Sequence, residues 1–138
     1  MKSTELIYVG DPMCSWCWGA ALEITQLKTH YSEEFDFRLL LGGLRPGTTH
    51  PWKASQRQYL RKHWEEIAHM TGQPFRFDIL AEEGFIYDTE IPSRAVYVCR
   101  LIAPDKEFSF FKAVQFAFYA QNKDTNQLET YLDICKKE

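Results

Sequence analysis

The first 45 residues carry two different hydrophobic patterns. Residues 6–9 are four consecutive apolar residues, a run typical of a strand that is buried on both faces. Residues 10–12, a Gly-Asp-Pro sequence, end this run. From Ser15 onward a period near 3.6 predicts one amphipathic helix. Its apolar stripe consists of Cys17, Ala21, Ile24, Leu27 and Tyr31.

Residues 35–41 predict a second strand. Phe37, Leu39 and Leu41 occupy alternate positions and therefore share one face, and a Gly-Gly pair follows. A strand, a helix and a strand joined at this length predict a right-handed βαβ unit with parallel strands. We therefore assign residues 1–45 to an N-terminal α/β unit.

The next part of the chain changes to a helical pattern. Pro51 suits the first position of a helix, and the apolar stripe that follows ends at Gly72 and Pro74. Residues 75–89 form an aromatic-rich linker in which we expect no long regular element. This pattern predicts one helix followed by an irregular connection.

Three further helical stripes occupy the last third of the chain. Asp124 and Gln127 resemble a capping box at the start of the last helix. No further strand is predicted, so residues 46–138 are assigned to a helical insertion domain. The fold class is α/β, with a βαβ unit followed by helices.

Composition and charge restrict the class of protein. A chain of 138 residues, 45% of them hydrophobic, allows one domain with its own core. A net charge of −3 argues against nucleic acid or an anionic membrane as a partner. No apolar stretch approaches the roughly 20 residues that span a bilayer, and the run at residues 6–9 is too short for a signal peptide. We expect a cytoplasmic protein.

The spacing of Cys14 and Cys17 predicts redox chemistry. This CxxC motif lies where the first strand passes into the helix. Unpaired N–H groups at a helix N-terminus stabilise a thiolate, which predicts a lowered pKa for Cys14 and a role as the attacking nucleophile. Cys17 lies one turn later on the apolar stripe, so we expect a partly buried, resolving thiol.

Other uses of the two cysteines are less consistent with the sequence. A zinc site needs four ligands, and no second CxxC is present. A c-type haem site needs His after Cys17, but Trp18 stands there. Cys99 and Cys135 lie on apolar helical stripes, which predicts buried structural thiols. We expect no metal and no organic cofactor, with glutathione as a candidate redox partner.

Four residues around the cysteines are candidates for substrate contact or tuning of the thiols: Asp11, Pro12, Ser15 and Trp16. A carboxylate at Asp11 would raise a neighbouring cysteine pKa, and stabilisation of the turn is an equally good reading of this residue. Trp16 is expected to be exposed and to contact an unfolded client. The remaining tryptophans are expected to pack in the core or the linker.

The sequence as a whole resembles DsbA-like thioredoxin-fold proteins, and within them the branch of predicted protein-disulfide isomerases. The matching segments are residues 8–19, 42–47, 63–65, 71–75, 87–90 and 117–120. The resemblance implies a thioredoxin fold interrupted by a helical insertion after the second strand. It also implies that Cys14 attacks and Cys17 resolves. A related branch, the kappa-class glutathione transferases and isomerases, generally has Ser in place of the attacking cysteine.

The family pattern also includes a return to the sheet, with a cis-proline that faces the CxxC motif. No proline of this chain follows the helical part, so we expect the C-terminal strands to be missing. The strand at residues 6–9 would then have an open edge, and such edges favour association. We therefore expect a homodimer or a larger assembly through this edge.

The predicted function is thiol–disulfide exchange or isomerisation with protein or peptide dithiols. The CxxC motif does not indicate the direction of electron flow, but a cytoplasmic location favours reduction or isomerisation. Two alternatives remain at this point. One is a glutathione-dependent transferase or isomerase of the kappa-class type. The other is a non-enzymatic module that binds clients through aromatic residues.

Overall fold

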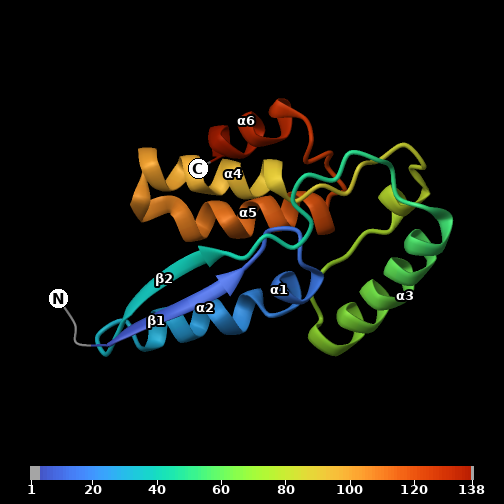
Figure 1. Cartoon of the computed structure of the whole chain (residues 1–138). Helices are drawn as coiled ribbons and strands as arrows, with labels where there is room; N and C mark the ends of the chain where they lie inside the picture. The colour runs from blue at the N-terminus through green and yellow to red at the C-terminus, as the bar shows by residue number, and fades with distance from the viewer. Residues whose placement is uncertain (1–3, 138) are drawn as a thin grey trace.

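The computed structural model describes residues 4–137 (Figure 1). Its elements follow the order β-α-α-β and then helices only, so the predicted βαβ unit and helical part are confirmed. The elements are β1 (Glu5–Gly10), α1 (Ser15–Gly19), α2 (Ala21–His30), β2 (Asp36–Leu41), α3 (Ala54–Thr71), η1 (Asp78–Ala81), α4 (Glu90–Ile102), η2 (Pro104–Lys106), α5 (Glu107–Tyr119) and α6 (Leu128–Lys137).

The two strands of the described residues form one parallel sheet. Its register runs from Glu5 opposite Asp36 to Gly10 opposite Leu41. One face carries Leu39 into a cluster formed with α4, α5 and α6. Figure 1 shows α4 and α5 lying side by side along the sheet, with α6 against them.

The prediction that the first strand is buried on both faces is wrong for the described residues. Ile7, Val9 and Leu40 share the face opposite Leu39 and are 49%, 58% and 42% exposed. The reason is that α4, α5 and α6 bury only the face that carries Leu39. The apolar run of β1 therefore has one buried and one open side.

The single helix predicted from Ser15 is interrupted. Ala20 separates α1 from α2, with φ −91° and ψ 6°, and its N–H donates to the Trp16 carbonyl. Gly19 lies so close to α3 that a Cβ there would stand 2.7 Å from the Ile67 Cγ2 methyl. The break therefore occurs where α1 packs against α3, a contact between distant parts of the sequence.

Helix α3 begins at Ala54 and not at the predicted Pro51. The indole of Trp52 is buried against Phe85 and donates to the Glu82 carbonyl over 2.8 Å, which holds this segment outside the helix. The predicted end is confirmed, because Gly72 follows the helix with a positive φ of 75° that suits glycine.

Two predictions for the last helix are wrong. The Asp124 carboxylate accepts the Asn126 N–H over 2.9 Å and so closes a turn that precedes α6, instead of forming a capping box with Gln127. Cys135 is exposed rather than buried, because α6 turns Tyr131 and Ile134 toward the core and leaves Cys135 outside that face. Cys99 is half-buried.

Two apolar clusters form the core, and α5 contributes to both. One contains Met13 and Trp18 from the CxxC region together with Trp52, Trp64 and Phe118, as expected for these tryptophans. The other joins the sheet to α4, α5 and α6. Each cluster contains residues from both sides of position 45, and the domain boundary stays a prediction. Within residues 4–137, no helix is both long and apolar enough to cross a membrane.

Candidate active site

The loop between β1 and α1 is held at its backbone by two buried tyrosines. The Met13 carbonyl accepts hydrogen bonds from the hydroxyls of Tyr87, over 2.5 Å, and of Tyr119. Met13 itself is fully buried. Because Tyr87 lies in the linker and Tyr119 at the end of α5, the helical part of the chain fixes the residue immediately before Cys14.

The Asp11 carboxylate fixes the same loop from the other side. One oxygen accepts the Met13 N–H and the other accepts the Leu44 N–H, each over 2.8 Å. Burial raises the pKa of Asp11 above its ordinary value, although these two hydrogen bonds oppose the rise. Asp11 therefore ties the CxxC loop to the turn after β2.

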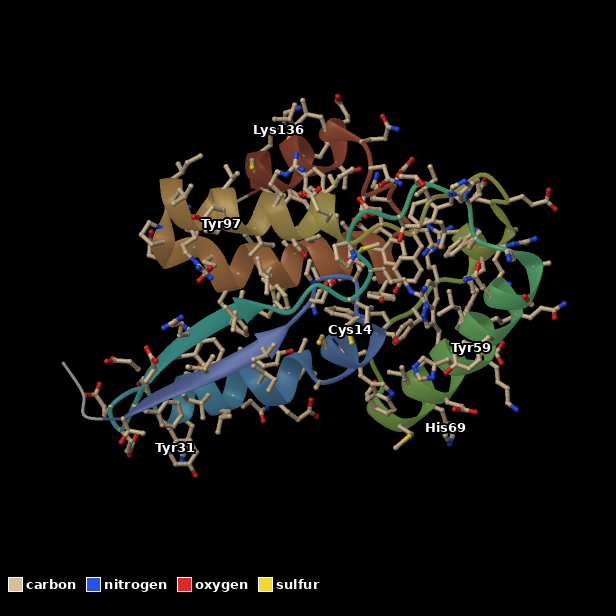
Figure 2. All side chains as sticks on the ribbon, viewed as in Figure 1. Cys14, Tyr31, Tyr59, His69, Tyr97 and Lys136 are labelled. Atoms are coloured by element: carbon tan, nitrogen blue, oxygen red, sulfur yellow. The ribbon has the colours of Figure 1, made fainter. Side chains whose placement is uncertain are left out.

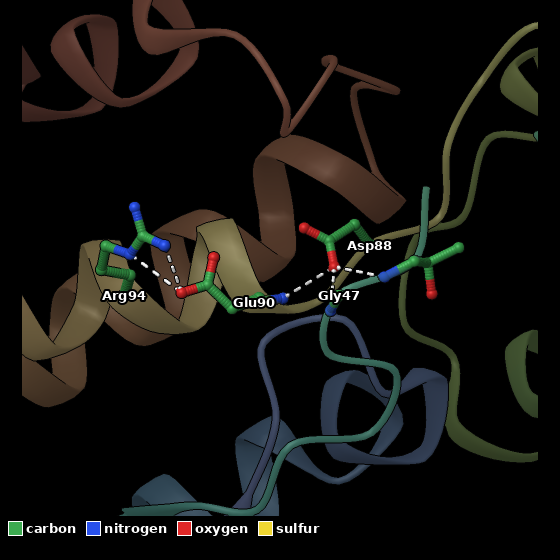
Figure 3. Close-up of polar contacts among 5 residues, drawn as sticks. Gly47, Asp88, Glu90 and Arg94 are labelled. Atoms are coloured by element: carbon green, nitrogen blue, oxygen red, sulfur yellow. Dashed lines mark hydrogen bonds and ion pairs between the residues drawn. The ribbon is translucent and has the colours of Figure 1, made fainter. Parts of the chain in front are cut away.

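That turn is fixed in its place by Asp88 and Thr89, which precede α4. One Asp88 oxygen accepts the N–H groups of Gly47, Thr48 and Glu90, as Figure 3 shows. The Thr89 hydroxyl accepts the Arg45 N–H over 2.8 Å. These bonds connect the start of α4 to the turn that Asp11 holds.

Cys14 and Cys17 lie together at the start of α1, as the CxxC spacing predicts. Cys14 is the N-cap residue of α1, and both thiols are half-buried. Figure 2 shows Cys14 beyond the end of β1, on the side of the molecule where α3 lies. The two side chains lie within hydrogen-bond reach of each other, so the first proton lost belongs to the pair rather than to one sulfur alone.

This interaction shifts the pKa values of Cys14 and Cys17 in opposite directions. The hydrogen bond from Cys14 lowers the pKa of Cys17 to about 6, although burial opposes the change. The pKa of Cys14 is raised, because its thiol donates to Cys17 and because burial and the Cys17 charge disfavour a second thiolate. The backbone N–H groups of Trp16 and Cys17 act on Cys14 in the expected direction but are outweighed. The lowered pKa predicted for Cys14 therefore belongs to Cys17 in this geometry.

Tyr8 is a site residue that the sequence did not single out. Its hydroxyl hydrogen-bonds to the Cys17 side chain from β1. The sequence gives no local signal of this contact. A tyrosine in the apolar run of a strand is expected to place its ring in the core, so its hydroxyl is not predicted to reach the CxxC motif. Tyr87 and Tyr119 were also missed as site residues, although both lie in segments that resemble the family.

The other predicted site residues occupy different environments. Asp11, Pro12 and Ser15 are buried, and Trp16 is 42% exposed, as expected. The Trp16 ring meets His63 of α3 edge-on, with ring centroids 6.3 Å apart, and His63 stacks on Tyr59 at 5.7 Å. Trp16 therefore begins a row of aromatic rings that continues onto α3.

A pocket of about 350 Å³ adjoins this region. Tyr87, whose hydroxyl holds the Met13 carbonyl, is part of its wall. The charged or titratable lining groups include Arg45, His50 and Lys53, and none of the described lining residues is acidic. The described residues contain no group of three or more His, Cys, Asp or Glu residues that could hold a metal ion.

A parallel βαβ unit with paired cysteines at the start of its helix, followed by a helical part, is the arrangement expected of a protein similar to DsbA-like thioredoxin-fold proteins. The solved structures agree. A candidate protein disulfide isomerase from Nitrosomonas europaea matches with a TM-score of 0.90 and 39% identity, over 99% of this chain and 65% of that one. The cytosolic disulfide reductase DsbM from Pseudomonas aeruginosa matches with a TM-score of 0.82 and 27% identity, over 96% and 63%. The predicted family resemblance is therefore confirmed.

Two further comparisons complete this picture. The ClpXP adapter protein SpxH of Shouchella clausii is 23% identical over 135 residues, which are 97% of this chain and 43% of SpxH. No protein-family model matches the chain. The chain thus spans between 43% and 65% of the length of the proteins named here.

Proposed function

We propose that this chain is a thiol–disulfide oxidoreductase that exchanges disulfides with protein or peptide thiols through Cys14 and Cys17. The observation that carries the proposal is the position of the two half-buried cysteines at the strand-to-helix junction, where Cys14 is the N-cap residue of α1 and interacts with Cys17. A pair that already holds one thiolate near neutral pH is prepared for nucleophilic attack, since the thiolate is the reactive form.

The reaction has two steps, in which Cys14 attacks and Cys17 resolves. When the proton of Cys14 passes to Cys17, the Cys14 thiolate attacks one sulfur of the substrate disulfide. The other sulfur leaves as a thiolate, which takes up the proton from Cys17. The Cys17 thiolate then attacks the Cys14 sulfur and displaces the second substrate thiolate. The substrate gains two electrons, and the protein retains a disulfide between its two cysteines.

The surroundings of the pair support a peptide or glutathione as the thiol partner. Trp16 offers an exposed ring beside the cysteines, and the pocket lined by Arg45, His50 and Lys53 has a basic wall that suits carboxylate groups. DsbM, one of the structural neighbours, was solved with GSH. Because DsbM is described as cytosolic, we also propose that this chain acts in the cytoplasm.

A redox titration tests the proposal. The purified chain is equilibrated in glutathione buffers, its thiols are trapped, and intact mass reports the oxidised fraction. We expect reversible interconversion of Cys14 and Cys17. Cys14→Ser should abolish turnover, and Cys17→Ser should accumulate the mixed disulfide.

The matched control is Cys135→Ser, which removes an exposed cysteine outside the site and should leave the titration unchanged. Failure of the pair to interconvert, or normal turnover by Cys14→Ser, would contradict the proposed function. Glutathione binding without any redox change would instead favour the transferase or isomerase alternative.

A further inference from the structure

Tyr8 is placed so that its hydroxyl reaches the active-site cysteines from within the sheet. Its ring packs between Phe37 of β2 and Phe111 of α5, with ring centroids 6.2 Å from each. The contact with Phe111 is edge-on, at 87°. The Tyr8 ring is packed by both elements, and its hydroxyl lies beside Gly10, at the end of β1 that leads into the CxxC loop.

Gly10 makes room for this orientation. A Cβ at Gly10 would stand 3.0 Å from the ring carbon that bears the Tyr8 hydroxyl and 3.2 Å from the hydroxyl oxygen. These distances are tighter than nearly all real Cβ contacts, so a side chain at Gly10 would require the Tyr8 ring and hydroxyl to shift by a few tenths of an ångström. β1 therefore ends in a glycine at the position where the Tyr8 side chain passes closest to the backbone.

The Tyr8 hydroxyl keeps its proton while it contacts Cys17. Burial raises the pKa of Tyr8 well above its ordinary value, and the hydrogen bond with Cys17 and the charges of both cysteines act in the same direction. The phenol therefore remains a hydrogen-bond donor throughout the pH range in which the cysteines react.

We propose that Tyr8 is a catalytic residue that donates a hydrogen bond to the Cys17 thiolate during the resolution step. This inference rests on the proposed function. In the resting pair, Cys17 receives side-chain hydrogen bonds from Cys14 and Tyr8. Once Cys14 is bonded to substrate, it has no proton to donate to Cys17. Of these two side-chain donors, only Tyr8 then remains.

The resolving step balances without a further reactant. The Cys17 sulfur forms a bond to the Cys14 sulfur, the bond between Cys14 and the substrate sulfur breaks, and its electron pair leaves on the substrate thiolate. The Tyr8 proton stays on the phenol. Its hydrogen bond keeps Cys17 ionised and limits its rotation away from Cys14.

Stopped-flow reaction of the reduced full chain with Ellman's disulfide separates the two steps. One coloured thiolate is released when Cys14 attacks and a second when Cys17 resolves. In Tyr8→Phe, the second phase should slow by about tenfold at neutral pH, and its pH midpoint should rise, because a hydrogen bond to a charged group is lost. The first phase should stay within about twofold of the wild type.

Gly10→Ala should slow the second phase in the same direction, because it shifts the hydroxyl by a few tenths of an ångström and keeps the phenol. Tyr31→Phe is the matched control, since Tyr31 is a partly exposed tyrosine of the surface (Figure 2). A second phase of wild-type rate and pH midpoint in Tyr8→Phe would overturn the inference. A wild-type protein that releases no second thiolate would instead overturn the proposed function.

Discussion

Asp11 offers the clearest test of how the active-site loop is held. Its carboxylate accepts the N–H groups of Met13 and Leu44, each over 2.8 Å, and is 4% exposed. Asp11→Ala removes both acceptors and leaves two N–H groups without their partner in a site that is largely closed to water. Asp11→Asn keeps one oxygen and so preserves one of the two bonds.

The expected loss of stability follows from these bonds. Each hydrogen bond to a charged group contributes roughly 1.5–3 kcal/mol, and relief of the buried charge offsets part of the loss. We expect Asp11→Ala to lower the free energy of unfolding by about 2–4 kcal/mol and Asp11→Asn by about 1–2 kcal/mol. For a chain of this size, the Ala variant should melt on the order of 10 °C lower.

The pH dependence of these differences has a definite sign. Because the folded-state pKa of Asp11 is raised by burial, the folded chain binds this proton more tightly than the unfolded chain does. Its contribution is therefore complete below the ordinary aspartate pKa and decreases as pH rises through the raised value. The stability difference between the wild type and Asp11→Asn should shrink over that interval.

Urea denaturation followed by circular dichroism measures both quantities, with the slope against urea checked for constancy. Asp105→Asn, at an exposed position of η2, serves as the control for loss of a carboxylate. A loss below about 0.5 kcal/mol in Asp11→Ala would refute the reasoning, because that is the range of ordinary surface substitutions. A stability difference that grows with pH would refute the sign.

Two further predictions concern the core and the sheet edge. Gln115 of α5 is fully buried, and neither atom of its amide has a hydrogen-bond partner among the described residues. Gln115→Leu should therefore raise the free energy of unfolding by about 1–2 kcal/mol, and a loss in urea denaturation would contradict this. The outer edge of β1 should associate chains at micromolar concentration, and a monodisperse monomer in light scattering would count against that expectation.

The sequence predicted the parts of the fold that have local signals. The run at residues 6–9, the alternation ending at Leu41 and the stop at Gly72 each depend on neighbouring residues, and all three elements are present. The break at Ala20 has no such signal, because it arises where Gly19 meets Ile67 of α3. The open face of β1 could not be predicted either, since the burial of a strand depends on which helices cover it.

The candidate site shows the same division between local and distant contacts. The spacing of Cys14 and Cys17 located the cysteine pair from four residues of sequence. The hydroxyls that hold the Met13 carbonyl come from Tyr87 and Tyr119, which lie 74 and 106 positions further along the chain. Contacts at such separations follow from the packing of α5 and the linker against the loop, which a local pattern does not contain.

The acidity of the cysteine pair bears on the direction of the reaction. Stabilising the thiolate stabilises the reduced form and so makes a disulfide more oxidising. Proteins with CxxC motifs span pKa values from about 3.5 in strong oxidants to about 7 in thioredoxin, a reductant. The first proton of the Cys14–Cys17 pair leaves with a pKa of about 6, which lies toward the reducing end of that range.

We therefore expect a reduction potential between about −270 and −180 mV, the interval between thioredoxin and protein disulfide isomerase. The hydrogen bonds accepted by the Asp11 carboxylate and the Met13 carbonyl hold the backbone of the loop and should persist in both oxidation states. Asp11 also acts on Cys17, whose pKa its backbone N–H lowers and its charge raises. The potential should then depend mainly on donors to the sulfurs, and Tyr8→Phe should make it more negative. A midpoint near about −120 mV would show that groups other than these stabilise the thiolate.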